Sequence, residues 1–510
     1  MSEIELKFGV PAESLAAVES ALRRLGARSR PIESHYWDSA DRRLAKAGLS
    51  LRLRKSAGRW EQTVKAAGAS PLESLEETVS RPGRWDAGGP PPELWMFAGT
   101  EAGRLVDAAL ARRHGHAPAL ERVHSSLIGR RAARIEVGGA DIEIALDHGA
   151  LVAGDRSLPV CEFEAELYRD DVAALVDFAH GSIDAHGMWL STIAKSTRGE
   201  RLSGRADERR AVKARPARLR GSASGEEIFR AVMHSCLEQV LANASVLAEG
   251  EIDDEVVHQL RVGIRRMRTA WRELGEWRGS LAAGWEAPAA DVFRALGDYR
   301  DRQTVAASMQ PLLAAAGSPD PVLQPPGPST SVDPVALARA RPFQHALLDV
   351  VAFVSRVNTT ETSDTKPSPA DSGRGEPGRM IGTRLDKLHA RLKRDARRFE
   401  QLDELDRHGV RKRLKRLRYL TELVAPLYRG GRVGRFLGDL EPAQDELGHY
   451  MDLVVAARLA GDVIAAGDAR AWFNVGWLKA QLPRAVERCR KALEHVAAAS
   501  PYWRGASHRR

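Results

Sequence analysis

The sequence predicts an α+β multidomain protein, with an N-terminal eight-stranded antiparallel β tunnel or barrel and a C-terminal all-α duplicated helical bundle. Three observations lead to this prediction. The 510 residues exceed what one hydrophobic core usually supports. Up to about residue 200, apolar residues recur mostly with a period of two, which is typical of strands. From about residue 225 onward the period becomes 3.6, which is typical of helices.

Short alternating segments bounded by turn residues define the expected strands. These segments are 3–8, 49–55, 60–66, 74–79, 122–128, 132–137, 141–147 and 160–167. Helical periodicity interrupts them at about 11–26 and 171–186. Many short strands separated by turn signals favour an antiparallel sheet or barrel.

Three segments lack either period and are rich in Gly, Ser, Pro, Thr or Arg. Residues 204–224 are expected to link a domain at 1–203 to a helical domain at 225–500. Residues 317–334 and 358–380 are expected to be unstructured insertions in the helical domain.

Charge and cysteine usage limit the partner and the compartment. The net charge of +9 and the pI of about 9.6 favour an anionic partner, which leaves nucleic acid, an acidic membrane and inorganic polyanions open. Cys161, Cys236 and Cys489 match no zinc or redox spacing. Because no signal peptide and no run of about 18 apolar residues is visible, we expect a cytoplasmic protein.

Charged side chains share faces along the expected strands, since residues two apart in a strand point the same way. Glu162, Glu164 and Glu166 share one face, and Arg52 and Arg54 share a face of another strand. For any single strand, a solvated outer face is the favoured interpretation. Taken together, acidic and basic strands are segregated, which favours charges that point into one shared space such as the lumen of a barrel.

The chemistry of such a lumen follows from its charges. Carboxylates alone would repel and raise one another's pKa. A divalent cation relieves this repulsion, and Mg²⁺ or Mn²⁺ suits ligands that are all oxygen. Arginine and lysine on the opposite wall would bind phosphate oxygens, arginine through two parallel hydrogen bonds.

Six segments carry these charges in a characteristic order. They are Glu3-Ile4-Glu5-Leu6-Lys7, Leu51-Arg52-Leu53-Arg54, Gln62-Thr63-Val64-Lys65, Ile142 to Asp147, Pro159 to Leu167 and Ser191 to Gly199. The first matches the Glu-x-Glu-x-Lys signature of the CYTH superfamily, the triphosphate tunnel metalloenzymes. The chain resembles this superfamily over about residues 1–203.

This resemblance implies an eight-stranded tunnel that binds triphosphate together with Mg²⁺ or Mn²⁺. The implied metal ligands are Glu3, Glu5, Glu162 and Glu164. The implied phosphate-binding residues are Lys7, Arg52, Arg54, Lys65, Arg122, Lys195 and Arg198. The implied catalytic residues are Glu3, Glu5, Lys7, Glu143 and Asp147, of which the last two would support metal or water.

The implied reaction is hydrolysis of inorganic triphosphate. Metal and basic residues would neutralise charge at the terminal phosphorus while a carboxylate orients the attacking water. The coupling to a second domain resembles the bacterial inorganic triphosphatases. Two alternatives stay open: a non-catalytic polyphosphate-binding protein, and an adenylate cyclase or another CYTH enzyme that acts on a triphosphate.

The second part of the chain contains an internal repeat. One histidine and three basic residues occur twice, 150 residues apart, as His258, Arg261, Arg265 and Arg268 and then as His408, Arg411, Lys415 and Arg418. Leu296–Asp301 is echoed 151 residues later by Leu447–Asp452. Two matches at nearly the same separation predict a duplicated helical domain.

The spacings of three and four place each basic set on one stripe of a helix. A third stripe contains Arg384, Lys387, Arg391 and Arg394. Solvated helix faces normally pair basic residues with Glu at i,i+4, and they are the favoured interpretation of a single stripe. Because three stripes largely lack acids, we expect an anion to lie across them.

The histidine-containing segment Val257-His258-Gln259-Leu260-Arg261, followed by Arg265-Arg266-Met267-Arg268, resembles the CHAD domain, and the resemblance covers about 225–500. This resemblance implies a helical bundle that binds inorganic polyphosphate along the three basic stripes. Duplex DNA is the rival anion, but no helix-turn-helix or zinc module is evident and aromatic residues are sparse among the stripes. We therefore expect neither sequence-specific nucleic acid nor a membrane as partner.

Overall fold

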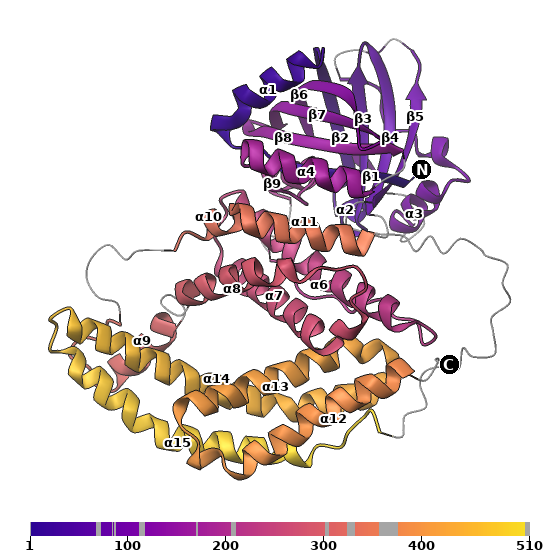
Figure 1. Ribbon diagram of the computed structural model, residues 1–510. Coiled ribbons are helices and arrows are strands. Elements are labelled where there is room, and N and C mark those ends of the chain that lie inside the picture. Colours follow the sequence, from indigo (N-terminus) through magenta and orange to yellow (C-terminus); the bar gives the residue numbers. More distant parts are fainter. Residues whose placement is uncertain are drawn as a thin grey trace, which may run out of the picture. The chain divides into compact units, whose positions relative to one another are not determined.

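The computed structural model describes residues 2–67, 73–83, 85, 88–111, 118–169, 172–205, 211–300, 305–323, 332–355 and 376–504. These residues form two compact units (Figure 1). Unit 1 comprises Met1–Ala211, Leu241–Glu251 and Ala338–Val357, and unit 2 comprises Val212–Val240, Ile252–Leu337 and Asn358–Arg510. Unit 1 therefore contains two segments from beyond the predicted 204–224 linker.

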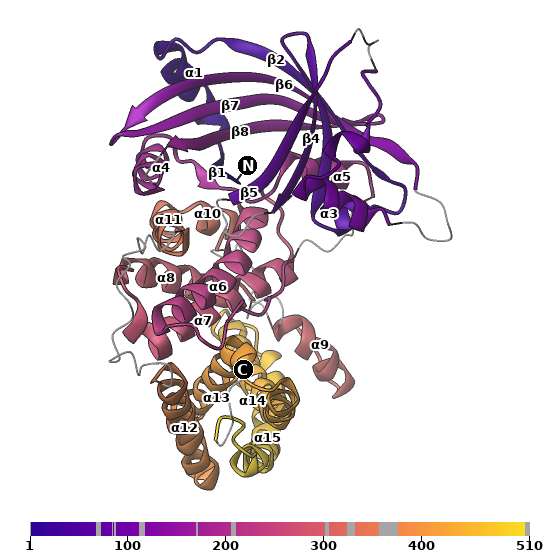
Figure 2. The same ribbon diagram turned by 90° about the vertical axis from the view of Figure 1, so that its right-hand side faces the viewer.

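The described residues of unit 1 form nine antiparallel strands in the order β5-β4-β3-β2-β6-β7-β8-β1-β9. β1 also pairs with β5, at the other end of this order, through three residue pairs. The strands are β1 Ser2–Gly9, β2 Ser29–Ser39, β3 Leu49–Ser56, β4 Arg59–Ala67, β5 Glu73–Arg81, β6 Leu120–Val137, β7 Ala140–Ala153, β8 Arg156–Arg169 and β9 Trp189–Leu190. The long strands β6, β7 and β8 run side by side (Figure 2).

The sequence predicts eight strands, and the structure corrects that prediction in three places. Segments 122–128 and 132–137 form one continuous strand, β6. The sequence does not predict β2, because this strand buries polar residues, including Ser34, His35 and Asp38, and so lacks the alternation of apolar and polar residues. β9 is only two residues long, too short to produce a period.

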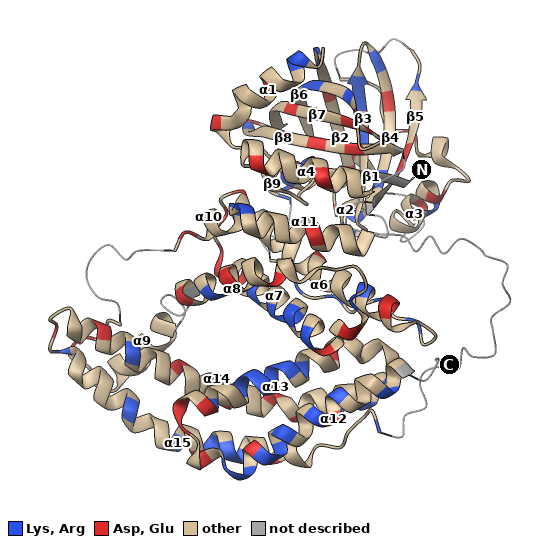
Figure 3. Ribbon diagram, viewed as in Figure 1, with Lys and Arg blue, Asp and Glu red and all other residues tan. Residues whose placement is uncertain are grey.

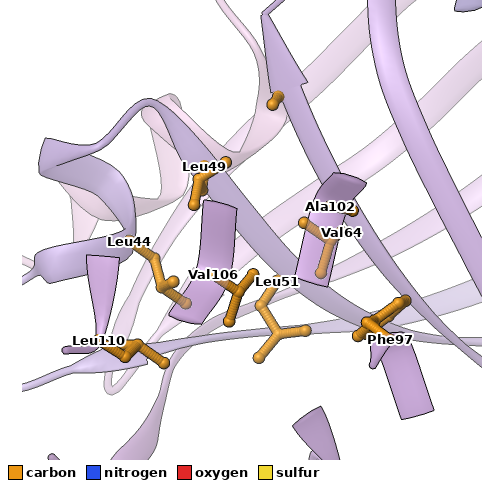
Figure 4. Close-up of a cluster of buried hydrophobic side chains, with 9 residues drawn as sticks. Leu44, Leu49, Leu51, Val64, Phe97, Ala102, Val106 and Leu110 are labelled. Atoms are coloured by element: carbon orange, nitrogen blue, oxygen red, sulfur yellow. The ribbon is translucent and has the colours of Figure 1, made fainter. Parts of the chain in front are cut away.

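The alternation of β3 separates apolar residues from basic ones. Leu49 and Leu51 are buried in an apolar cluster with Val64 of β4 and Phe97 (Figure 4). This cluster packs the sheet against short helices and fixes the backbone of β3. The helices of unit 1 before residue 205 are α1 Leu15–Arg24, α2 Arg43–Lys46, α3 Glu101–Ala109, α4 Val172–His186 and α5 Lys195–Leu202.

Two later segments complete unit 1. α11, Arg341–Ser355, packs along α4, and the side chain of Gln344 accepts a 2.8 Å hydrogen bond from the backbone of Leu190. Ser245, near the end of α6, accepts a 3.0 Å hydrogen bond from the backbone of Thr192. These two hydrogen bonds fix the backbone at Leu190 of β9 and at Thr192 just after it.

Unit 2 is helical. Among the described residues its helices, two of which continue into unit 1, are α6 Gly225–Ala248, α7 Asp254–Leu274, α8 Glu286–Arg300, α9 Ala306–Ala315, α10 Pro334–Arg339, α12 Glu376–Arg397, α13 Glu404–Val424, α14 Gly430–Ala465 and α15 Ala471–Ala498. Within the described ranges of the chain, each helix is too short or too polar to cross a lipid bilayer.

α7 and α13 correspond residue for residue at a separation of 150. Both are 21 residues long, and each starts after an aspartate, Asp253 or Asp403, whose side chain accepts hydrogen bonds from backbone N–H groups of the first turn. Such caps satisfy amide groups that a helix start leaves unpaired. This correspondence supports the predicted duplication for these two helices.

The predicted insertions are partly ordered. Residues 317–323 contain no helix or strand, but Ser318 donates a 2.6 Å hydrogen bond to Asn474, and Leu323 is fully buried. The prediction is wrong for 376–380, because α12 begins at Glu376. Residues 324–331 and 356–375 lie outside the described residues.

Candidate functional site

A cavity of about 410 Å³ lies in unit 1 among strands β1 to β8 and helix α5. Among the described residues, its wall carries both signs of charge. The basic side chains are Lys7, Arg30, Arg52, Arg54, Arg59, Lys65, Arg130 and Lys195. The acidic ones are Glu5, Glu61, Glu76, Glu143, Glu164 and Glu166. On β1, β3 and β8, side chains two residues apart in sequence therefore point into the same cavity, as the alternation predicts.

Arg130 connects two buried carboxylates. Its guanidinium donates two 2.6 Å hydrogen bonds to Asp147 and a third to Glu164. Burial alone would lower the pKa of Arg130, but the charges of Glu164 and Asp147 outweigh burial and raise it. The sequence assigns Arg130 no role, because this residue falls between the two predicted strands that merge into β6.

Lys195, at the start of α5, is the second centre of this network. Its ammonium nitrogen lies 2.9 Å from Asp147, 2.6 Å from Glu162 and 2.8 Å from Glu164. Burial would raise the pKa of Glu164, but Lys195, Arg130 and Lys7 together lower it well below the ordinary value.

The close approach of α5 to the sheet depends on Gly199. A Cβ atom at this position would lie 2.0 Å from the buried ring of His124 on β6. Only glycine permits that approach. The approach places both Lys195 and Arg198 against β8, where they contact the carboxylate of Glu162.

Glu162 is almost fully buried, at 1% exposure, and does not line the cavity. Both of its oxygens are bound, one to Lys195 and one to Arg198. The structure therefore places Glu162 inside the acid–base network, while Glu164, two residues further on β8, reaches the cavity wall.

A second network of alternating charges crosses the cavity. Glu76 lies 3.2 Å from both Arg52 and Lys65, and Lys65 lies 3.4 Å from Glu5. Burial would raise the pKa of Glu76, but the charges of Arg52 and Lys65 outweigh it and lower that pKa to about 2. The sequence pattern assigns Glu76 no role in metal or phosphate binding.

Arg54 differs from the other buried cations. Among the described residues, no carboxylate lies within ion-pair distance of its guanidinium, and its Nε makes no hydrogen bond. Burial, followed by the charges of Arg52 and Arg130, lowers the pKa of Arg54 to about 10. A half-buried cation without a paired acid is costly to keep away from water.

Glu5 and Glu164 are two cavity-lining carboxylates that share one cationic neighbour. Their oxygens lie 3.5 Å and 3.9 Å from the same ammonium group, that of Lys7. Oxygen donors around one cationic position fit Mg²⁺ or Mn²⁺ in chemistry. Among the described residues, no three His, Cys, Asp or Glu side chains are positioned to hold an ion. The side chain of Glu3 lies outside the described residues.

Arg122, an implied phosphate-binding residue, does not line the cavity. A β-bulge on β6 pairs His124 with Tyr36 but Arg122 with Trp37, so the two side chains point to opposite faces. Arg122 is exposed. After burial, its charge is the next largest factor that lowers the pKa of His35.

Unit 2 contains a larger cavity of about 880 Å³, called here the basic groove. Its walls are mainly α7, α13 and α14, of which α7 and α13 carry rows of Lys and Arg (Figure 3). The basic side chains among its described lining residues are Arg261, Arg265, Arg268, Arg272, Arg411, Lys412, Lys415, Arg416, Arg458 and Lys479, together with His408. The acidic ones are Glu404 and Asp452.

Aromatic residues position the arginines of the basic groove. The guanidinium groups of Arg261 and Arg265 lie 4.9 Å and 5.0 Å from the ring centre of Phe293. Arg265 also donates a 3.2 Å hydrogen bond to the hydroxyl of Tyr419. Burial, followed by the charges of Lys412 and Arg411, lowers the pKa of His408.

Six predicted polyphosphate-binding residues do not line the basic groove. His258 is half-buried on α7 and absent from the lining. Arg418 is committed elsewhere, through 2.6 Å contacts with Glu422 and Gln444. On α12, Arg384 pairs with Glu276. The rest of the third stripe, Lys387, Arg391 and Arg394, is exposed.

Two family models of known proteins match two different ranges of the chain. Residues 1–188 match the family model described as the CYTH domain, and residues 231–461 match that of the CHAD domain. Strands β1 to β8 and most of the cavity lining thus belong to the part of the chain that matches the CYTH domain. More particularly, the chain combines a CYTH domain with a CHAD domain.

Among solved structures, the chain is similar to the CHAD domain of the plant Ricinus communis, with 24% identity over 58% of this chain and 99% of that one, at a TM-score of 0.44. It is also similar to a putative adenylyl cyclase from Hippeastrum that is described as having a dominant triphosphatase activity. That match has 18% identity over 40% of this chain and 98% of that one, at a TM-score of 0.29.

Proposed function

We propose that unit 1 hydrolyses inorganic triphosphate and that the ring of strands β1 to β8 encloses the substrate in a tunnel. The observation that carries this proposal is Arg54, a half-buried cation on the cavity wall for which the described part of the chain provides no paired carboxylate. Triphosphate supplies the missing negative charge. CYTH family membership supports the same class of phosphoanhydride hydrolase.

In this proposal Arg52, Arg54 and Lys65 bind the phosphate oxygens from β3 and β4. Their charges offset the charge that develops as the terminal phosphorus is attacked. Glu143, which lines the cavity at 23% side-chain exposure, orients the water and takes its proton. The water oxygen bonds to the terminal phosphorus, the phosphoanhydride P–O bond breaks, and diphosphate leaves.

The buried network has a positioning role in this scheme. Asp147 is bound by Arg130 and Lys195 and does not line the cavity. Glu162 is bound by Lys195 and Arg198. These carboxylates hold the cations at fixed positions, which lowers the cost of reorganising them during the reaction.

Glu5 and Glu164, together with Glu3, would hold Mg²⁺ or Mn²⁺. When bound, the metal supplies positive charge next to the phosphate oxygens. The ammonium of Lys7, now shared by Glu5 and Glu164, would then be available to a phosphate oxygen.

We further propose that the basic groove of unit 2 binds inorganic polyphosphate. Ten Lys and Arg side chains against two acidic ones, among the described lining residues, leave a strong positive field. CHAD family membership supports this partner, and the correspondence of α7 and α13 supports a groove built from two copies of one motif.

Phosphate release by the full chain tests the catalytic proposal. Triphosphate, long-chain polyphosphate and ATP are each supplied with Mg²⁺ or Mn²⁺. Release from triphosphate is expected, with loss in Glu5→Ala and retention in Glu13→Ala, which changes an exposed glutamate outside the cavity. Formation of cyclic AMP from ATP would contradict the proposal. If the chain binds triphosphate but releases no phosphate, unit 1 is a triphosphate-binding domain and not a hydrolase.

A further inference from the structure

A pair of histidines in unit 1 lies outside both charged cavities. His180 belongs to α4 and His345 to α11. Their rings are nearly parallel, at 5°, with centres 4.6 Å apart, and the two Nδ1 atoms face each other in direct contact. Both side chains are partly exposed, at 24% and 27%, so the pair is open to solvent.

Each imidazole is also bound to an aspartate on the opposite helix. Nε2 of His180 lies 3.3 Å from Asp349 of α11, and Nε2 of His345 lies 2.8 Å from Asp184 of α4. On each helix the aspartate follows the histidine by four residues, which places both on one helix face. The arrangement is reciprocal, since each helix contributes one histidine and one aspartate.

These contacts decide which ring nitrogens carry hydrogen. An aspartate carboxylate only accepts hydrogen bonds, so each Nε2 is the donor. A neutral imidazole with hydrogen on Nε2 has its lone pair on Nδ1. If both rings are neutral, the two Nδ1 lone pairs point at each other, so a cation must lie between them, either a proton carried by one ring or a metal ion.

We propose that His180 and His345 bind one divalent transition-metal ion, of the zinc class, through their Nδ1 atoms. Imidazole is a preferred ligand of such ions. Metal-bound histidines usually donate their other N–H to a carboxylate, as both do here. Ion binding requires the two Nδ1 atoms to move apart until each lies at the ligand distance of about 2.0–2.1 Å from the ion.

The proposed site has two protein ligands. Among the described residues, no third His, Cys, Asp or Glu is positioned to complete it, so water fills the remaining positions. Asp184 and Asp349 place negative charge beside the ion. The ion would tie α4 to α11, and so join the CYTH-matched part of the chain to a helix from the CHAD-matched part.

Zinc binding by the chelator-treated full chain tests this proposal. Isothermal titration should show that the natural protein binds one more equivalent of Zn²⁺ per chain than His180→Ala or His345→Ala does. Zn²⁺ should raise the melting temperature of the natural protein, and a chelator should reverse the increase. His186→Ala changes another histidine of α4 and should bind as the natural protein does.

Two further variants make the test specific. Asp184→Asn keeps the fold and both ligands, and it should weaken Zn²⁺ binding by about 10–100-fold if the carboxylate orients the ring. Glu5→Ala removes a carboxylate from the wall of the unit 1 cavity, and this variant should still bind the additional equivalent of Zn²⁺. Equal Zn²⁺ binding by the natural protein, His180→Ala and His345→Ala would overturn the proposal, whatever the outcome for triphosphate hydrolysis.

Discussion

Arg130 binds Asp147 through two parallel hydrogen bonds, from Nε and Nη2, each 2.6 Å long. The same guanidinium binds Glu164, and Lys195 contacts both carboxylates. The proposed active site therefore rests on a preassembled set of buried ion pairs that exists before substrate arrives.

Arg130→Met should destabilise unit 1 by about 3–5 kcal/mol, because removing one partner of a buried ion pair leaves uncompensated charge. Hydrogen exchange of the β6 and β7 amides measures this loss. Arg134→Ala changes an arginine on the same strand that is 55% exposed, and it should shift stability by less than about 0.5 kcal/mol. Equal effects of the two variants would contradict the importance of the buried network.

Arg54→Met should have the opposite profile. Because Arg54 has no paired acid among the described residues, its removal should leave the melting temperature unchanged or higher. Loss of one phosphate-binding charge should lower kcat/KM for triphosphate by about 10²–10³-fold. Lys55→Met, next on β3 with its ammonium over the ring of Trp60, is the matched control and should retain full activity.

Glu76 predicts an acid-sensitive contribution to stability. Its pKa falls from 4.5 to about 2 on folding, so the stabilisation is complete above pH 4.5 and is lost as pH falls toward 2. Thermal unfolding between about pH 7 and pH 3 measures this. The natural protein should lose stability more steeply below pH 4.5 than Glu76→Gln does. Parallel curves would show that Arg52 and Lys65 do not stabilise the carboxylate.

In the basic groove, Arg265→Ala and Lys415→Ala should each weaken binding of long-chain polyphosphate. Binding that releases counterions also depends on salt, and the slope of log affinity against log salt should fall by about 1 for each charge removed. Arg418→Ala is the matched control, since Arg418 pairs with Glu422 outside the groove lining. A change of slope in the control as large as in the two variants would argue for a diffuse charge effect.

His408 predicts stronger polyphosphate binding at lower pH. In the free protein its pKa is lowered from 6.5 by burial and by Lys412, Arg411, Lys415 and Arg265. A bound polyanion offsets these charges and raises the pKa, so binding takes up a proton near and below pH 6.5. Affinity should rise between about pH 7.5 and pH 5.5, and His408→Asn should flatten this dependence. An unchanged pH profile in the variant would exclude His408 as the titrating group.

Strand alternation was enough to predict which faces of β1, β3 and β8 carry the cavity. Arg52, Arg54 and Glu164 all line it because the side-chain period of a strand is independent of tertiary packing. The same rule failed at Arg122, because a bulge adds one residue and reverses the face. It also missed Arg130, since the segment around Gly129 and Ala132 carries no apolar alternation.

Helical spacing likewise predicted the stripes of α7 and α13, but not which stripes meet. Whether a stripe lines a groove depends on how helices pack, which no local period encodes. The α12 stripe shows this: Lys387 and Arg391 have the expected spacing and are exposed, yet they do not line the basic groove. Arg418 has the right spacing too, and its contacts with Glu422 and Gln444 take it out of the groove.

The membership of α11 and residues 241–251 in unit 1 has a consequence for modularity. A chain ended after Ala211 would keep every strand, but it would expose the surface of α4 that α11 covers, and the backbone of Thr192 would lose Ser245. This compact unit is therefore discontinuous in sequence. Transplanting the tunnel into another protein would require both later segments, and recombination at the 204–224 linker would separate residues that pack as one body.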